Sequence, residues 1–193
     1  MRPPPAILVL AAGASSRMRG ADKLLEPVDG IPLILRAVRA ACAVSARVVV
    51  TLPPNSDRAA WLGDSPARRI TVAGRAMSAS IRAGVTALPD ADAILIHLAD
   101  MPDIAAPELQ ALADAWTTGT FGILRATAAD GTPGQPVVFA REHFPALLSL
   151  TGDRGARDLL AGPGVAHLPL PGRAALTDLD TPEDWAEWRT RHH

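Results

Sequence analysis

Residues 6–25 read AILVLAAGASSRMRGADKLL, a short apolar run followed by a loop rich in small, hydroxyl and cationic residues. The run at 6–11 has the length and composition of a buried β-strand, and proline and glycine flank it. A simple connection between two elements does not need this much flexibility and positive charge together. The segment therefore predicts the first strand of a sheet and, after it, a turn that binds an anion.

Apolar strand patterns alternate with amphipathic helix patterns through the first two thirds of the chain. Strands are expected at 47–52, 70–72 and 93–98, and helices at 77–88 and 106–116. This alternation predicts an α/β fold with a mainly parallel sheet and helices on both faces. After Phe121 the pattern becomes irregular, which predicts a small insertion in the second half of the sheet. Because no linker or repeat divides the 193 residues, we expect a single domain over 1–193.

Composition excludes several classes of protein. The formal net charge of −1 gives no global attraction to nucleic acid or to an anionic membrane. Cys42 is the only cysteine, which excludes an internal disulfide and a cysteine-based metal site. The apolar run near the N-terminus is too short to span a membrane. We therefore expect a cytoplasmic protein with neither a nucleic-acid nor a membrane partner.

In an open parallel sheet, ligands bind beyond the carboxyl ends of the strands, so the loops there are the first candidates. Small residues around Gly13 let backbone N–H groups approach an anion. The Ser15 hydroxyl, the Arg17 guanidinium and the Lys23 ammonium add donors suited to phosphate oxygens. The combination predicts a polyphosphate cradle, although neither the P-loop nor the dinucleotide-binding fingerprint is present. An ordinary strand-to-helix turn with solvated charges is the alternative.

Carboxylates follow two other parts of the pattern. Asp100 comes directly after the apolar run 93–98, where a carboxylate can hold Mg²⁺ together with nucleotide phosphates. An aspartate that merely ends a strand in a turn is the alternative interpretation. Asp178 and Asp180 come just before a predicted helix that starts at Thr181. Helix capping explains the residue types from Thr181 onward, but it gives no role to these two carboxylates.

Three of these segments resemble one family. LAAGASSRMRGADKLL at 10–25 resembles the signature LAAGxSxRMG…K of nucleotidyltransferases with the MobA-like fold, although Arg19 replaces the usual glycine. LADMP at 98–102 and TDLDTPEDW at 177–185 are similar to the metal-binding and closing segments of that family. Within the family the chain is most similar to the MocA-type molybdenum cofactor cytidylyltransferases. The resemblance implies a Rossmann-like, GT-A-like nucleotidyltransferase fold.

The resemblance also implies a nucleotide site. Arg17, Lys23 and Asp100 are the expected catalytic residues, with Asp100 and Asp180 as metal ligands and Asp178 as the substitute for Asp180. MSAS at 77–80 resembles a segment that lies near the base and ribose, with Ala76 in place of the usual glycine. The expected nucleotide-binding residues are Leu10, Ala11, Ala12, Gly13, Ser15, Arg17, Lys23, Arg75, Ser78 and Ser80.

Two later segments resemble the acceptor side of the family. GQPVVF at 134–139 is similar to GHPVLF, with Gln135 in place of the common histidine. GDRGAR at 152–157 is similar to the GDxGAR segment of the MocA-type subgroup. The resemblance implies Gln135, Asp153, Arg154 and Arg157 as acceptor-binding residues. A salt-bridged helix start is the alternative interpretation of the second segment.

The implied reaction is the Mg²⁺-dependent transfer of CMP from CTP to the terminal phosphate of molybdopterin, with release of pyrophosphate. An ionised phosphate acceptor needs no general base, so positioning and charge stabilisation would supply the catalysis. Ala12 favours CTP, because relatives with LAAG rather than LAGG tend to use CTP. An apo-molybdoenzyme or its chaperone is the implied recipient. The alternatives are a sugar- or alcohol-phosphate nucleotidyltransferase and a non-catalytic carrier of the molybdenum cofactor.

Overall fold

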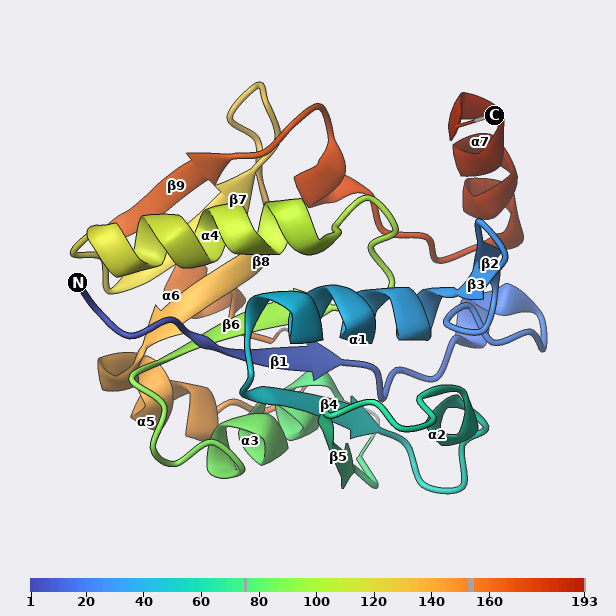
Figure 1. Cartoon of the computed structure of the whole chain (residues 1–193), viewed down its shortest axis with the longest axis horizontal. Coiled ribbons are helices and arrows are strands. Elements are labelled where there is room, and N and C mark those ends of the chain that lie inside the picture. The colour runs from blue at the N-terminus through green and yellow to red at the C-terminus, as the bar shows by residue number, and fades with distance from the viewer. Residues whose placement is uncertain (75, 153–154, 193) are drawn as a thin grey trace.

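The computed structural model describes residues 1–74, 76–152 and 155–192 (Figure 1). In this part of the chain, a seven-stranded sheet has the order β5-β4-β1-β6-β8-β7-β9. Its strands are β1 (Ala6–Leu10), β4 (Val48–Leu52), β5 (Arg68–Thr71), β6 (Ala93–Leu98), β7 (Ile123–Thr127), β8 (Pro133–Ala140) and β9 (Val165–Pro169). A separate small hairpin contains β2 (Pro27–Val28) and β3 (Ile31–Pro32).

The sheet is mainly parallel, as the alternating pattern predicts. β1 pairs in parallel with β4 and with β6, and β4 pairs in parallel with β5. β8 runs antiparallel to both β6 and β7, and β9 is again parallel to β7. The irregular pattern after Phe121 corresponds to this one reversed strand of the described sheet.

Helices cover both faces of the sheet (Figure 1). The α-helices are α1 (Leu33–Val44), α2 (Arg58–Trp61), α3 (Met77–Thr86), α4 (Ala106–Thr118), α5 (Phe144–Leu148), α6 (Arg157–Leu160) and α7 (Pro182–His192). Short 3₁₀ turns occur at η1 (Ser16–Met18), η2 (Arg141–His143) and η3 (Ala174–Leu176). α1 and α4 pack together over one face, whereas α3 and α5 pack together on the other.

The side-chain patterns explain this layering. In β1, Ile7 and Val9 belong to the core under α1 and α4, whereas Leu8 belongs to the core under α3. This alternation, with both faces buried, is typical of a central strand in an α/β sheet. α1 buries Leu33, Ile34, Ala37, Val38 and Ala41, the stripe that its spacing of three and four predicts.

The C-terminal helix lies beside the β2–β3 hairpin (Figure 1), and its Arg189 pairs with Glu26 at 2.9 Å. Trp185 and Trp188 are buried, and the Trp188 indole N–H donates to Asp103 Oδ1 at 2.8 Å. At the start of α7, the Thr181 hydroxyl accepts from the Asp184 N–H, and the Asp184 carboxylate accepts from the Thr181 N–H. This reciprocal cap fixes the residues just before the helix, which include Asp180.

Some boundaries differ from the expected ones. The strand expected at 70–72 is Arg68–Thr71, an edge strand with solvent-exposed arginines, so its apolar signal is weak. The β2–β3 hairpin was not predicted, although Asp29 and Gly30 at its turn both have positive φ and form a known hairpin signal. No helix in the described ranges is long and apolar enough to cross a membrane.

Candidate functional site

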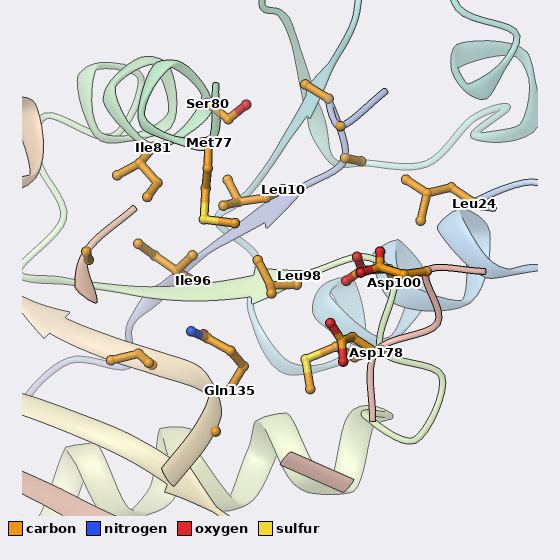
Figure 2. Close-up of a pocket in the computed structure, with 18 of the residues that line it drawn as sticks. Leu10, Leu24, Met77, Ser80, Ile81, Ile96, Leu98, Asp100, Gln135 and Asp178 are labelled. Carbon is orange, nitrogen blue, oxygen red and sulfur yellow. The ribbon is translucent and has the colours of Figure 1, made fainter. Parts of the chain in front are cut away.

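A cavity of about 750 Å³ lies beyond the carboxyl ends of β1 and β6. Ser80, Met77 and Ile81 of α3 form one wall, and Gln135 of β8 lies across from them (Figure 2). Asp100 and Asp178 lie together at one end of the cavity (Figure 2). The cavity is therefore at the position where an open α/β sheet binds its ligands.

Most of the residues that the sequence implicates line this one cavity. They are Leu10, Ala11, Ala12, Gly13, Ser15, Arg17, Lys23, Ser80, Asp100, Gln135, Arg157, Asp178 and Asp180. Parallel pairing brings the first and the acidic loops together, because Leu10 and Leu98 are neighbours at the ends of β1 and β6. Arg75, Asp153 and Arg154 lie outside the described residues.

At the acidic end, one ammonium group connects the two expected metal ligands. Lys23 Nζ donates to Asp180 Oδ1 at 2.6 Å and also to Asp100 Oδ2. Burial alone would lower the pKa of Lys23, but attraction and hydrogen bonds from the two carboxylates outweigh it and raise that pKa. Lys23 therefore stays protonated and holds the cationic loop against both aspartates.

Arg17 adds a second cation at the same place. Its Nη1 lies 2.6 Å from Asp180 Oδ2, while the rest of the side chain is exposed to solvent. Asp180 thus has one oxygen on Lys23 and the other on Arg17. Because the Arg17 side chain is mostly exposed, it can exchange this partner for a phosphate oxygen without leaving a buried cation unpaired.

The position of the aspartates depends on the backbone around them. The Leu179 N–H donates to the Asp100 carbonyl at 3.2 Å, which places the segment before α7 beside the loop after β6. Burial, followed by repulsion from Asp100 and Asp180, raises the pKa of Asp178. Three carboxylates therefore share one partly buried region, which stabilises a bound cation.

The donor set fits a divalent metal that shares its coordination with phosphates. Asp100 Oδ1 is buried and has no hydrogen-bond partner within the described residues. No group of three or more His, Cys, Asp or Glu residues in that part of the chain is arranged to hold a metal alone. Mg²⁺ commonly takes one or two carboxylates and completes its shell with waters and phosphates, so Asp100 and Asp180 suffice on the protein side.

The first loop has an unusual backbone. Ser15 and Arg19 adopt left-handed conformations, with φ of 49° and 52°, and bracket the η1 turn. A side chain in that region costs about 1 kcal/mol, which suits the glycine of the family signature better than Arg19. The Arg19 guanidinium points to Glu183 at 2.7 Å, and Arg19 is not among the residues that line the cavity. The loop thus accommodates the substitution by pairing the side chain with α7.

On the α3 wall the two expected serines differ. Both side chains are buried, but Ser80 lines the cavity and Ser78 is not among the lining residues. Residues two apart on a helix lie about 200° apart around its axis, so the two side chains point in different directions. Ser78 as a nucleotide contact stays a prediction, and its side chain is not part of the cavity lining. Met77 and Ile81 complete this wall, and α6 contributes Arg157 to the cavity.

The wall formed by β7 and β8 contains a cation that was not predicted from the sequence. Arg125 of β7 lines the cavity, and its Nε donates to the Gly134 carbonyl at 2.9 Å. Burial lowers the pKa of Arg125. A charged residue inside the apolar run of β7 was the available signal, because such a residue is costly unless it faces a partner or an opening. Gln135 directly follows Gly134, the residue on β8 that accepts this hydrogen bond from Arg125.

Comparison with known proteins agrees with this geometry. The profile of the MobA-like NTP transferase domain matches residues 7–169. The chain belongs to this family. It is therefore a nucleotidyltransferase, with the expected fold class and with the first strand, the cationic loop and the acidic loop all inside the matched region.

Individual relatives cover nearly the whole chain. A protein of Synechococcus elongatus named probable molybdenum cofactor guanylyltransferase is 33% identical over 187 residues, which are 93% of this chain and 95% of that protein. The crystal structure of Rv0371c from Mycobacterium tuberculosis H37Rv matches with a TM-score of 0.80 and 28% identity, covering 95% of this chain and 97% of the other. A manganese complex of Rv0371c matches with a TM-score of 0.80 and 25% identity, covering 96% and 97%.

Proposed function

We propose that this nucleotidyltransferase transfers a nucleoside monophosphate from CTP to the terminal phosphate of molybdopterin and releases pyrophosphate. The observation that supports it best is the contact of Lys23 with both Asp100 and Asp180 in one cavity. It joins the cationic loop to the acidic ligands, the two parts that a nucleoside triphosphate and its metal need together.

The reaction is an attack on phosphorus. An oxygen of the acceptor phosphate forms a bond to the α-phosphorus of the nucleotide, and the bond from that phosphorus to the bridging oxygen of the β-phosphate breaks. Both reactants are anions, so repulsion and alignment are the main obstacles. A cation about 4 Å from a phosphate charge contributes about 4 kcal/mol at an effective dielectric of 20, before desolvation. Arg17, Lys23 and the backbone N–H groups around Gly13 are the groups placed to supply this.

Asp100 and Asp180 would hold Mg²⁺ in this proposal. When bound, the ion neutralises and orients the phosphate oxygens as the pyrophosphate leaves. The manganese complex of Rv0371c supports a divalent ion in this family without distinguishing Mg²⁺ from Mn²⁺. The unpartnered Asp100 Oδ1 supports the same assignment, since it is the one carboxylate oxygen of this pair with no bond to Lys23 or Arg17.

The remaining lining residues are assigned to the two substrates. Leu10 to Gly13 and Ser80 are proposed to face the nucleoside, with Arg75 as a further contact. Gln135 and Arg157 are proposed to face the acceptor, together with Asp153 and Arg154. The resemblance of GDRGAR to the MocA-type subgroup supports molybdopterin as that acceptor, and so does the printed name of the Synechococcus relative.

GTP is the second candidate donor, because the Synechococcus relative is named a guanylyltransferase. Ala12 is the residue that would separate the two. Ala12 is only 5% exposed and lines the cavity. If the base lies against it, removal of the methyl group leaves more room for the larger purine. We therefore expect Ala12→Gly to raise the ratio of GTP to CTP turnover.

The deciding experiment measures pyrophosphate release from CTP and from GTP with Mg²⁺ and molybdopterin as the acceptor. Wild type should prefer CTP, Ala12→Gly should shift toward GTP, and Asp100→Ala should lose at least 100-fold in turnover. A sugar phosphate supplied as the only acceptor serves as the comparison. Turnover with the sugar phosphate but not with molybdopterin would replace the proposed acceptor. Binding of molybdopterin with no turnover of any nucleotide would favour the non-catalytic carrier.

Three further expectations belong to this proposal. We propose that residues 1–193 act as one nucleotidyltransferase domain, which the profile match over 7–169 supports. A cytoplasmic location and transfer of the product to an apo-molybdoenzyme or its chaperone stay predictions.

A further inference from the structure

Arg58 opens the short helix α2, after β4, and is 3% exposed. It is not among the residues that line the cavity. Its guanidinium nevertheless contacts the first loop through all three nitrogens. Nε donates to Asp22 Oδ2 at 2.6 Å, and Nη2 donates to Asp22 Oδ1 at 2.7 Å. This two-point geometry is the strongest form of ion pair between these side chains.

The same guanidinium reaches the other end of the loop. Nη1 donates to the Ala11 carbonyl at 2.6 Å, and Nη2 also donates to Ser15 Oγ at 3.0 Å. Ser15 Oγ in turn donates to Asp22 Oδ1 at 3.1 Å. Arg58 therefore connects the first residue after β1, the left-handed Ser15 and the residue just before Lys23. One buried side chain closes the loop between residues 11 and 22.

Asp22 also fixes the backbone on both sides of Lys23. Its Oδ1 accepts from the Leu24 N–H at 3.0 Å, so the backbone turns around Lys23. Burial alone would raise the pKa of Asp22, but the hydrogen bonds and charge of Arg58 outweigh it and lower that pKa. The carboxylate stays ionised, and the turn that presents Lys23 to Asp100 and Asp180 stays fixed.

We propose that Arg58 is a positioning residue that pre-forms the phosphate-binding loop without touching the nucleotide. Ser15 has a strained left-handed backbone, which persists only where its surroundings over-determine it. A loop held in its bound shape loses less entropy when the phosphates arrive, so its affinity is higher. The inference rests on the proposed role of this loop in binding the triphosphate, but not on the identity of the base or the acceptor.

A purely structural role for Arg58 makes a different prediction. In that case the ion pair would only hold α2 against the sheet, and its loss would lower stability but not the phosphate affinity of the folded protein. Arg69 is the matched control, because it donates to the Ala59 and Gly63 carbonyls and so holds α2 without contacting the loop. Arg58→Lys keeps the charge and removes the fork, and Arg69→Lys makes the same change at the control site.

The test measures the affinity for inorganic tripolyphosphate with Mg²⁺ by titration calorimetry, at a temperature where circular dichroism shows each variant folded. We expect Arg58→Lys to bind at least 10-fold more weakly than wild type, and Arg69→Lys within twofold of it. Affinities of Arg58→Lys within twofold of wild type would overturn the proposal. So would wild-type protein that binds no tripolyphosphate, since the loop would then hold no polyphosphate.

A second variant keeps the proposal testable if Arg58→Lys does not fold. Asp22→Asn removes the charge at the other side of the pair and should weaken tripolyphosphate binding by a similar factor. Where all variants fold, the variant that combines Arg58→Lys and Asp22→Asn should bind tripolyphosphate no more weakly than the weaker-binding single variant. Both substitutions break the same network of hydrogen bonds. Additive losses would overturn the network. Absence of turnover with molybdopterin, while tripolyphosphate binding follows the expected pattern, would reject the proposed function and leave the role of Arg58 standing.

Discussion

Lys23 Nζ lies 2.6 Å from Asp180 Oδ1 and donates at the same time to Asp100. A single ammonium group therefore compensates the two carboxylates that the proposed function assigns to the metal. The side chain of Lys23 is 11% exposed, that of Asp180 is 21% exposed and that of Asp100 is 19% exposed, so solvent screens these charges weakly. In the proposed function, Lys23 and a divalent ion would therefore compete for these two carboxylates until nucleotide phosphates give the ammonium another partner.

This competition predicts an opposite effect of one substitution on metal binding and on catalysis. Lys23→Met removes the internal cation and leaves two carboxylates close together, which favours any added cation. We expect the affinity for Mn²⁺ without nucleotide to rise about 10-fold or more, measured by electron paramagnetic resonance of free Mn²⁺. Nucleotidyl transfer should fall at least 100-fold, because the phosphates lose a cation.

Arg36→Met is the control for this comparison. Arg36 pairs with Asp29 at 2.8 Å and does not line the cavity, so the variant removes one positive charge elsewhere. Its Mn²⁺ affinity and turnover should both stay within twofold of wild type. A fall in Mn²⁺ affinity on Lys23→Met would mean that Lys23 shapes the site rather than competing for it.

Two nearby arginines of the first loop should behave differently. Arg17 lines the cavity, whereas the Arg19 guanidinium pairs with Glu183 on α7. Arg17→Ala should weaken CTP and GTP binding about 10-fold, the effect of losing one charge-assisted hydrogen bond. Arg19→Gly should leave both affinities within twofold, since glycine also tolerates the left-handed backbone. Isothermal titration in the presence of Mg²⁺ checks both, and equal losses would show that Arg19 also reaches the phosphates.

The central features of the site could be predicted from sequence for a topological reason. The first loop and Asp100 follow apolar runs that are adjacent parallel strands, and such strands end at the same edge of a sheet. Local rules also sufficed for the cap of α7 at Thr181 and for the buried stripe of α1. In each case the decisive information lay within one short segment.

The rest depended on contacts between distant segments. Arg58 is 36 residues from Asp22, and nothing in the sequence around either one indicates the other. Arg125 reaches the cavity only because the reversed strand β8 places Gly134 beside it. Asp103 accepts a hydrogen bond from Trp188, which lies 85 residues later in the chain. Such partners follow from packing, which a pattern of residue types does not specify.

A side chain at position 134 should disturb both the packing of β8 and the proposed metal site. A Cβ at this position would overlap the Ala175 carbonyl, a backbone group that cannot move without shifting the segment that leads to Asp178 and Asp180. Gly134→Ala should lower the free energy of unfolding in urea by about 1–3 kcal/mol and weaken Mn²⁺ binding as well. Gly162→Ala, where a Cβ makes only ordinary contact with Leu159, should change neither by much. Unchanged Mn²⁺ affinity in Gly134→Ala would show that the segment relaxes elsewhere.

The burial of His97 should make the stability of the protein depend on pH. It is fully buried in β6, and neither ring nitrogen has a hydrogen-bond partner among the residues described. Burial lowers its pKa from 6.5 to about 4, so the unfolded chain binds this proton more readily between those values. Its contribution to stability is therefore complete above pH 6.5 and is lost as the pH falls toward 4, on the order of 3 kcal/mol. His97→Leu should match or exceed wild type at pH 7.5 in urea unfolding, and its advantage should grow toward pH 4.5. Parallel pH profiles for the two proteins would contradict this account, because all other titrating groups are common to both.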